Sequence, residues 1–110
     1  TPSANNGIKL EKFVFDALSL CTSSIVFETD RIEEFAPIKN ATGLDSPQTC
    51  REIQTLRASR WLESRNVQIP KNPDGTPNCT VEISPITASS PAELPASLPT
   101  KIQPGESVLL

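Results

Sequence analysis

Apolar residues recur at helical spacing near the start of the chain. They are separated by three positions or by one, at Leu10, Phe13, Val14, Ala17, Leu18 and Cys21. This spacing predicts an α-helix over residues 10–21 that presses one face into a core, with Phe13 buried in the middle of that face. The Asn6-Gly7 pair predicts a turn just upstream, so Lys9 is expected at the junction between a loop and the helix. From that junction its ammonium group can reach over a neighbouring cleft.

The next elements are predicted to be shorter. Residues 25–28 (Ile-Val-Phe-Glu) are β-branched and aromatic, which is typical of a buried strand. A charged turn follows, in which Glu33 and Glu34 are either two carboxylate ligands of a metal ion or solvated charges. We favour solvated charges, because adjacent side chains rarely converge on one ion. Pro37 keeps the preceding residue out of the helical region, so Lys39 is expected on an extended or loop segment.

A second helix is predicted from Pro47 to about Asn66. Ser46 is a favourable N-cap residue, and Pro47 suits the first helical position, where a backbone N–H would have no partner. The apolar positions form a thinner stripe than that of the first helix: Cys50, Ile53, Leu56, Trp61 and Leu62. The helix is locally basic, with Arg51, Arg57, Arg60 and Arg65. We interpret these arginines as a solvated face, with phosphate binding as the alternative.

The last third of the chain is rich in turn residues. Residues 70–78 contain three prolines and form a connector. Val81 and Ile83 alternate with polar residues, which predicts a half-buried strand. Residues 87–104 are rich in Ser, Pro and Ala, so we expect them to bury little and to be mobile or draped over another surface. Residues 107–110 are predicted to add a final short strand.

Composition and charge narrow the class of protein. The 110 residues, with 36% hydrophobic content and 11 prolines, suit one small domain or a piece of a larger one, and we expect a fragment. The net charge of −3 argues against nucleic-acid binding and against a polybasic membrane anchor, and no apolar run is long enough to span a membrane. The three cysteines, Cys21, Cys50 and Cys79, have no paired spacing, which favours free thiols in a reducing compartment such as the cytoplasm. Without histidine or a Cys-x-x-Cys pair, no metal site is predicted within the chain.

Several motifs, in order along the chain, resemble one enzyme family. Residues 6–16 (Asn-Gly-Ile-Lys-Leu-Glu-Lys-Phe-Val-Phe-Asp) resemble the segment that opens the C-terminal part of the UDP-N-acetylhexosamine pyrophosphorylases. The resemblance continues through Phe-Glu at 27–28, Arg-Ile-Glu-Glu-Phe-Ala-Pro-Ile-Lys-Asn-Ala at 31–41, Asp-Ser-Pro at 45–47 and Cys-Thr-Val-Glu-Ile-Ser-Pro at 79–85. Residues 86–110 resemble the family poorly.

This resemblance implies a uridylyltransferase that joins UTP to N-acetylglucosamine 1-phosphate, forming UDP-N-acetylglucosamine and releasing pyrophosphate. It implies that Lys39, in the family's Pro-aliphatic-Lys-Asn motif, is a catalytic residue that contacts the phosphates. Lys9, in the Asn-Gly-Ile-Lys motif, is implied as a second phosphate-binding lysine. A Mg²⁺ cofactor would be held mainly by substrate phosphates and by residues outside this chain.

The fold implied by the resemblance is α/β, with two helices and short strands. Residues 1–42 would be the C-terminal edge of a Rossmann-like nucleotidyltransferase catalytic domain. Residues 43–110 would form a small α+β C-terminal domain with a Pro/Ser-rich tail. The family's glycine-rich nucleotide loop and its uracil-binding and sugar-binding residues are missing from the sequence. We therefore expect this chain to be inactive alone and to act together with the upstream catalytic domain.

Two other functions stay open at this point. A non-catalytic interaction module would bind its partner through the prolines of the tail, although Pro91, Pro95, Pro99 and Pro104 do not have the Pro-x-x-Pro spacing. A fragment of a UDP-glucose-type pyrophosphorylase would share the fold, but residues 6–13 favour the N-acetylhexosamine branch. The sequence does not distinguish N-acetylglucosamine from N-acetylgalactosamine as the sugar.

Overall fold

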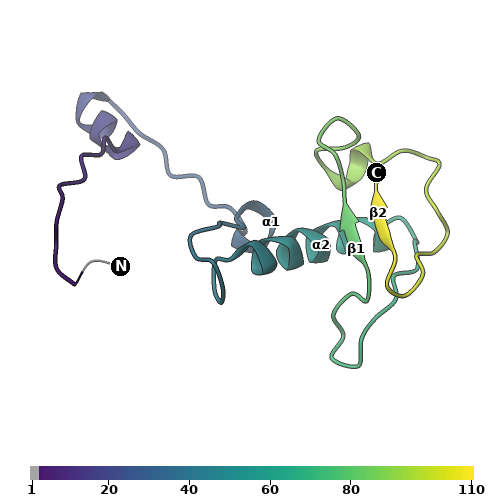
Figure 1. The fold of residues 1–110 in the computed structure, drawn as a ribbon. Helices are drawn as coiled ribbons and strands as arrows, with labels where there is room; N and C mark the ends of the chain where they lie inside the picture. Colours follow the sequence, from purple (N-terminus) through teal and green to yellow (C-terminus); the bar gives the residue numbers. More distant parts are fainter. Residues whose placement is uncertain (1–2) are drawn as a thin grey trace.

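The computed structural model describes residues 3–110, which form an extended N-terminal arm and a folded part built around one long helix (Figure 1). The arm runs from residue 3 to residue 30, and every residue in it is exposed. Its extension explains the radius of gyration of 19.1 Å, since a compact domain of about 100 residues has a radius of gyration of about 13 Å. Between residues 3 and 110, no helix is both long and apolar enough to cross a bilayer.

The arm contains a 3₁₀ helix, η1, that runs from Val14 to Leu20 and has no buried residue. The α-helix predicted over residues 10–21 is therefore wrong, and so is the predicted burial of Phe13, which is 56% exposed. A short amphipathic helix is marginal in water and depends on a partner for its apolar face. In this chain that face meets only solvent. The strand predicted at residues 25–28 is wrong for the same reason, because this segment is unpaired and Val26 is 99% exposed.

A one-turn helix, α1, runs from Arg31 to Glu34 and joins the arm to the folded part. Asp30 caps this helix, because its carboxylate accepts a hydrogen bond of 3.0 Å from the backbone N–H of Ile32. α1 packs against the long helix that follows it. The chain then continues without regular structure, so the predicted loop position of Lys39 is confirmed.

The long helix, α2, runs from Pro47 to Glu63, and its predicted start is confirmed. The helix ends before the predicted Asn66, which adopts a left-handed conformation with φ of 64°. One side of α2 faces the interior, through Cys50, Thr55, Ala58, Ser59, Trp61 and Leu62. The buried face thus combines small and polar residues with two large apolar ones, which explains why the apolar stripe in the sequence is thin.

Two short strands follow, and both were predicted. β1 runs from Thr80 to Glu82 and packs on α2, and β2 runs from Ser107 to Leu109 and pairs in parallel with β1. Val81 of β1 is buried, and its backbone N–H donates a hydrogen bond of 3.4 Å to the hydroxyl of Thr55 on α2. The crossover between the strands contains a second 3₁₀ helix, η2, from Pro91 to Glu93. The described residues therefore form a small mixed fold of helix and short parallel strands, consistent with the α/β class predicted.

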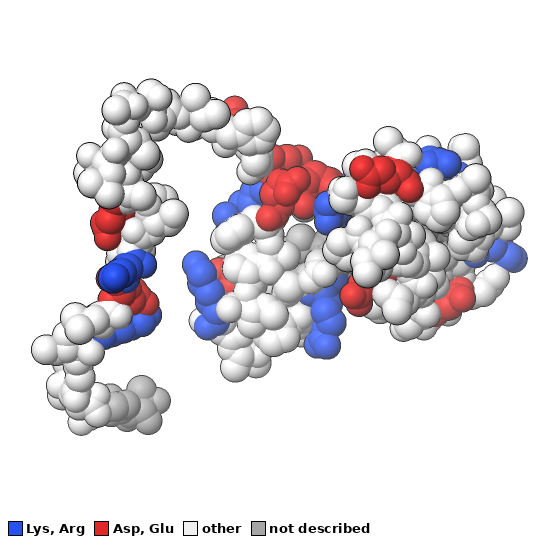
Figure 2. Space-filling view, turned by 90° about the horizontal axis from the view of Figure 1, so that it is seen from above, with Lys and Arg blue, Asp and Glu red and all other residues white. Residues whose placement is uncertain are grey.

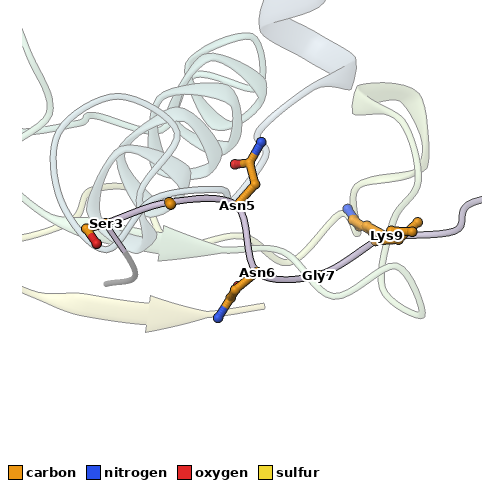
Figure 3. A pocket seen from close by; sticks show the side chains of 7 residues that line it. Ser3, Asn5, Asn6, Gly7 and Lys9 are labelled. Atoms are coloured by element: carbon orange, nitrogen blue, oxygen red, sulfur yellow. The ribbon is translucent and has the colours of Figure 1, made fainter.

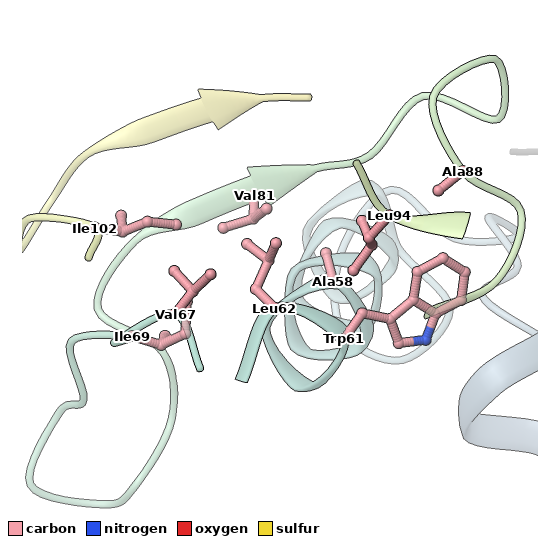
Figure 4. Packing of buried hydrophobic residues seen from close by; sticks show 9 residues of the cluster. All are labelled: Ala58, Trp61, Leu62, Val67, Ile69, Val81, Ala88, Leu94 and Ile102. Carbon is pink, nitrogen blue, oxygen red and sulfur yellow. The ribbon is translucent and has the colours of Figure 1, made fainter. Parts of the chain in front are cut away.

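The hydrophobic core lies between α2, the strands and the crossover (Figure 4). Its buried residues are Ala58, Trp61, Leu62, Val67, Ile69, Val81, Ala88, Leu94 and Ile102. Three of them come from residues 87–104, which we expected to bury little. That expectation is wrong, because Ala88, Leu94 and Ile102 are each at most 5% exposed. Three widely spaced apolar residues suffice to hold this segment against α2 and β1.

Candidate functional site

Lys39, the residue implied as catalytic, lies on a loop whose backbone is closed by hydrogen bonds. The backbone N–H groups of Lys39 and Asn40 both donate to the carbonyl oxygen of Asp45, at 2.6 and 3.0 Å. The side-chain amide of Asn40 donates to the carbonyl oxygen of Leu44 at 2.8 Å. The side chain of Lys39 is exposed. The loop therefore holds its own backbone while presenting the ammonium group of Lys39 to solvent.

The end of this loop is fixed by the start of α2. Asp45 has a positive φ of 52°, a conformation that aspartate tolerates better than most residues. Ser46 and Thr49 then form a reciprocal cap: the Ser46 hydroxyl accepts from the Thr49 N–H at 3.3 Å, and the Thr49 hydroxyl accepts from the Ser46 N–H at 2.9 Å. Ser46 is 2% exposed. The last residue of the loop is thus followed directly by the buried N-cap of α2.

Sequence reasoning did not assign a role to Asn40 or Asp45, although both fix the Lys39 loop. A signal for Asp45 exists in the sequence, because it stands directly before a favourable N-cap and a proline, where the chain must turn. The hydrogen bonds that it accepts come from residues five and six positions earlier. No local pattern predicts such a pairing.

Lys9, the second lysine implied to contact phosphates, lies on an extended segment rather than at the start of a helix. Its ammonium group pairs with the carboxylate of Glu11, and its side chain is 80% exposed. A hollow of about 480 Å³ beside it is lined only by residues 3–9 (Figure 3). This hollow is a curve of the arm, to which no residue of the folded part contributes. The structure therefore does not bring Lys9 and Lys39 together in one pocket.

A cluster of charged and aromatic side chains joins α1 to α2. The Glu33 carboxylate pairs with the guanidinium of Arg60 through one oxygen. Its other oxygen lies 3.4 Å from Nε of Arg57 and accepts a hydrogen bond of 3.3 Å from the indole N–H of Trp61. The guanidinium of Arg57 also stacks over the Trp61 ring, 4.1 Å from its centroid. Figure 2 shows acidic and basic side chains meeting where the arm joins the folded part.

This cluster corrects two interpretations made from the sequence. Glu33 is not simply a solvated charge, since it forms ion pairs with Arg57 and Arg60 and accepts a hydrogen bond from Trp61, all on α2. The arginines of α2 are not simply a solvated face either: Arg57 and Arg60 hold Glu33, and Arg65 donates to the carbonyl oxygen of Leu94 at 3.0 Å. Among residues 3–110, no three His, Cys, Asp or Glu side chains gather as a metal site.

A groove of about 710 Å³ lies between the first half of α2 and the connector before β1. Arg51, Glu52 and Leu56 line it from the helix, and Asp74 and Cys79 line it from the connector. Hydrogen bonds from the hydroxyl and N–H of Thr76 hold the pKa of Asp74 below its usual range. Burial raises the pKa of the Cys79 thiol. Both acidic and basic side chains line the groove, so its charge does not indicate whether a ligand would be an anion or a cation.

All three cysteines are free thiols in the described chain, as the sequence predicted. Cys21 is exposed, Cys50 is buried and Cys79 is half-buried.

The sequence has relatives among known proteins. It is 37% identical over 103 residues to the mouse (Mus musculus) UDP-N-acetylhexosamine pyrophosphorylase-like protein 1, a match that covers 81% of this chain and 20% of that protein. It is 37% identical over 92 residues to a probable UDP-N-acetylglucosamine pyrophosphorylase of Dictyostelium discoideum, covering 80% of this chain and 18% of that protein. With UDP-N-acetylglucosamine diphosphorylase 2 of Arabidopsis thaliana it shares 42% identity over 66 residues, which cover 56% of this chain and 13% of the relative.

The relatives are thus much longer than this chain, which spans about a fifth of the length of the first two. No family model matches the sequence, and no solved structure matches it. Relatives from animals, an amoeba and a plant nevertheless carry names of the same kind. Over about 80% of its length, this chain is homologous to UDP-N-acetylhexosamine pyrophosphorylases, which is consistent with a portion of such an enzyme.

Proposed function

We propose that this chain is the C-terminal segment of a cytoplasmic uridylyltransferase. The whole enzyme would form UDP-N-acetylglucosamine and pyrophosphate from UTP and N-acetylglucosamine 1-phosphate. The observation that carries this proposal is the match of about 80% of the chain to proteins named for UDP-N-acetylglucosamine or UDP-N-acetylhexosamine pyrophosphorylase activity. The run at residues 6–13, which resembles the N-acetylhexosamine branch of the family, argues against the UDP-glucose alternative.

Lys39 is the residue of this chain that we assign to the chemistry. In the reaction, a phosphate oxygen of the sugar phosphate attacks the α-phosphorus of UTP, and the bond to the leaving pyrophosphate breaks. Negative charge on the phosphoryl oxygens must be neutralised, and positioning and electrostatics supply most of the catalysis in such transfers. A lysine is suited to this role, because its ammonium is a compact charge on a flexible stem. The closed backbone of the Lys39 loop supports the role, since it fixes the root of that stem.

Lys9 would be a second phosphate-binding lysine, and Mg²⁺ would be held mainly by substrate phosphates and by residues outside this chain. The arm that carries Lys9 leaves many large apolar side chains in solvent, among them Ile8, Leu10 and Val26, each at least 90% exposed. Apolar surface of this extent is typical of an interface. We propose that the upstream catalytic domain covers it, with residues 1–42 forming the edge of that domain and residues 43–110 the small C-terminal domain.

The alternative of a proline-rich interaction module receives little support. A linear motif must be free to enter the groove of its partner. Here Leu94, which lies between Pro91 and Pro95, is in the core, and Arg65 donates to the backbone carbonyls of Pro91 and Leu94. The backbone of this part of the tail is therefore held within its own fold.

The test of the proposed function is the substitution Lys39→Ala in the full-length enzyme. We expect turnover with UTP and N-acetylglucosamine 1-phosphate to fall at least tenfold, since about 1.4 kcal/mol of lost transition-state stabilisation gives a factor of ten. Lys101→Ala, at an exposed lysine outside the loop, is the matched control and should keep the parental rate. A parental rate in the Lys39→Ala enzyme would remove Lys39 from the site.

A further inference from the structure

Lys39 stands midway between two attachments to α2. Six residues after it, Asp45 precedes the buried cap of the helix and accepts the Lys39 N–H. Six residues before it, Glu33 bonds to Arg57, Arg60 and Trp61. Upstream of Glu33 the chain is exposed arm. The contacts of Glu33 are thus the polar contacts that attach the segment leading to Lys39 to the folded part.

We propose that Glu33 is a positioning residue for Lys39. Through its contacts with α2 it sets where the chain enters the Lys39 loop, and so where the ammonium group lies relative to the bound phosphates. This inference rests on the proposed function of Lys39. It assigns to Glu33 no contact with substrate.

The geometry of the carboxylate favours such a role. Both oxygens are engaged, one by Arg60 and the other by Arg57 and Trp61, so the orientation of the carboxylate is fixed from two sides. A single exposed ion pair contributes little to stability. The side chains of Glu33, Arg57 and Arg60 are each about a third exposed. Two hydrogen bonds, from Arg60 and Trp61, and an ion pair with Arg57 nevertheless act on this one carboxylate, so together they restrict a single side chain. The guanidinium of Arg57 stacks on the Trp61 ring, which holds these two partners of Glu33 against each other.

The position of Lys39 matters because phosphoryl transfer depends on aligned groups. A displacement of about 1 Å by a substitution remote from the reacting atoms can cost a large factor in rate. A residue that fixes the loop therefore affects turnover even though it does not touch the nucleotide. A substitution of Glu33 should therefore lower turnover only while Lys39 is present. A substitution that merely destabilised the fold would lower turnover whether or not Lys39 is present.

The decisive experiment is a double-mutant cycle in the full-length enzyme with Glu33→Gln and Lys39→Ala. We expect Glu33→Gln to lower turnover about fivefold in the parental enzyme and to have no further effect once Lys39 is alanine, since residues that act through one another are not additive. Glu34→Gln is the matched control: Glu34 is the neighbouring residue of α1 and forms no ion pair among the described residues. It should keep the parental rate.

A spectroscopic readout tests the contact without activity. Trp61 is the sole tryptophan of the chain, and Glu33→Gln and Glu33→Ala should both shift its fluorescence in the 110-residue chain, while Glu34→Gln should not. Amide exchange of Lys39 should become faster in the Glu33 variants, with the exchange of the core Leu62 amide unchanged. Equal acceleration at both amides would mean that Glu33 only stabilises the fold, and would overturn the inference.

The kinetic outcomes separate the two proposals. If Lys39→Ala lowers the rate and Glu33→Gln is neutral, or if the effects of the two substitutions multiply, Glu33 does not act through Lys39 and only this inference fails. If Lys39→Ala leaves the rate unchanged, the assignment of Lys39 fails and the role of Glu33 fails with it. Loss of the Glu33→Gln effect in the Lys39→Ala background supports both.

Discussion

The backbone N–H of Lys39 donates a hydrogen bond of 2.6 Å to the carbonyl oxygen of Asp45. This bond closes a loop of seven residues, and Asp45 is also the residue that leads into the cap of α2. The root of the Lys39 side chain is therefore linked to the start of α2, the longest helix among residues 3–110. The loop fixes the backbone of Lys39, while the flexible side chain leaves the ammonium group free to follow phosphate oxygens as their negative charge changes during phosphoryl transfer.

The conformation of Asp45 predicts how the loop responds to substitution. Asp45→Val should destabilise the 110-residue chain by about 1–2 kcal/mol, because a β-branched residue is strained at the positive φ of 52°. Asp45→Gly is the matched control and should be nearly neutral, since glycine adopts this region freely. Urea unfolding followed by Trp61 fluorescence measures both. Equal stability of the two variants would show that the backbone conformation at Asp45 does not limit the loop.

The core predicts a second contrast. Leu62 is 0% exposed, so Leu62→Ala should lower the free energy of unfolding by about 2–5 kcal/mol. Phe13→Ala, at the residue that the helical spacing wrongly places in the core, should change it by less than about 0.5 kcal/mol, because Phe13 is 56% exposed on the arm. Thermal unfolding of both variants by circular dichroism compares them. A larger loss of stability in Phe13→Ala than in Leu62→Ala would contradict a core built around Leu62 and would show that Phe13 is buried.

The start of α2 and both strands could be predicted because their signals are local. Ser46 and Pro47 suit the N-cap and the first helical position whatever surrounds them. Val81 lies in an alternating run and is buried, as that alternation predicts. The arm carries an equally clear helical spacing but has nothing to pack against, so the spacing at Phe13 predicted a structure that the chain does not form. Periodicity shows which face would be buried, and burial itself needs a partner.

The polar contacts that define the candidate site could not be predicted in the same way. Glu33 and the indole N–H of Trp61 are separated by 28 positions, and no spacing rule links residues so far apart. Ala88 and Leu94 lie in a segment whose composition is typical of disorder, yet each is at most 5% exposed. Composition averages over a segment, whereas a small core needs only a few apolar residues at suitable positions.

The cysteines predict a dependence of labelling on pH. Burial raises the pKa of Cys79 above its ordinary value, so at pH 8 this thiol should be mostly protonated and should react slowly with a thiolate-specific reagent. The exposed Cys21 should react first. Because folding raises the pKa of Cys79, the stabilisation that it contributes is complete below the thiol pKa of the unfolded chain and is lost as the pH rises through the folded value.

Mass spectrometry of the chain after brief alkylation at several pH values measures this order. Denatured chain is the control, in which Cys21 and Cys79 should be labelled at similar rates. Labelling of Cys79 before Cys21 in the folded chain at pH 8 would contradict the prediction.

The last prediction concerns the 110-residue chain without the rest of its enzyme. We expect it to bind UTP only weakly and to form no UDP-N-acetylglucosamine. Lys39 is exposed on its loop, whereas Lys9 pairs with Glu11 and lines a hollow built from residues 3–9 alone, so the two cations do not lie in one pocket. Exposed charges are screened by salt over about 8–10 Å at physiological ionic strength, so any binding through these lysines should weaken further as salt rises. Titration calorimetry with Mg-UTP at low and physiological salt measures this, with Lys39→Ala as the control. A dissociation constant in the micromolar range or below, lost in the Lys39→Ala chain, would show that the fragment holds a complete nucleotide site and does not need the upstream domain to bind its substrate.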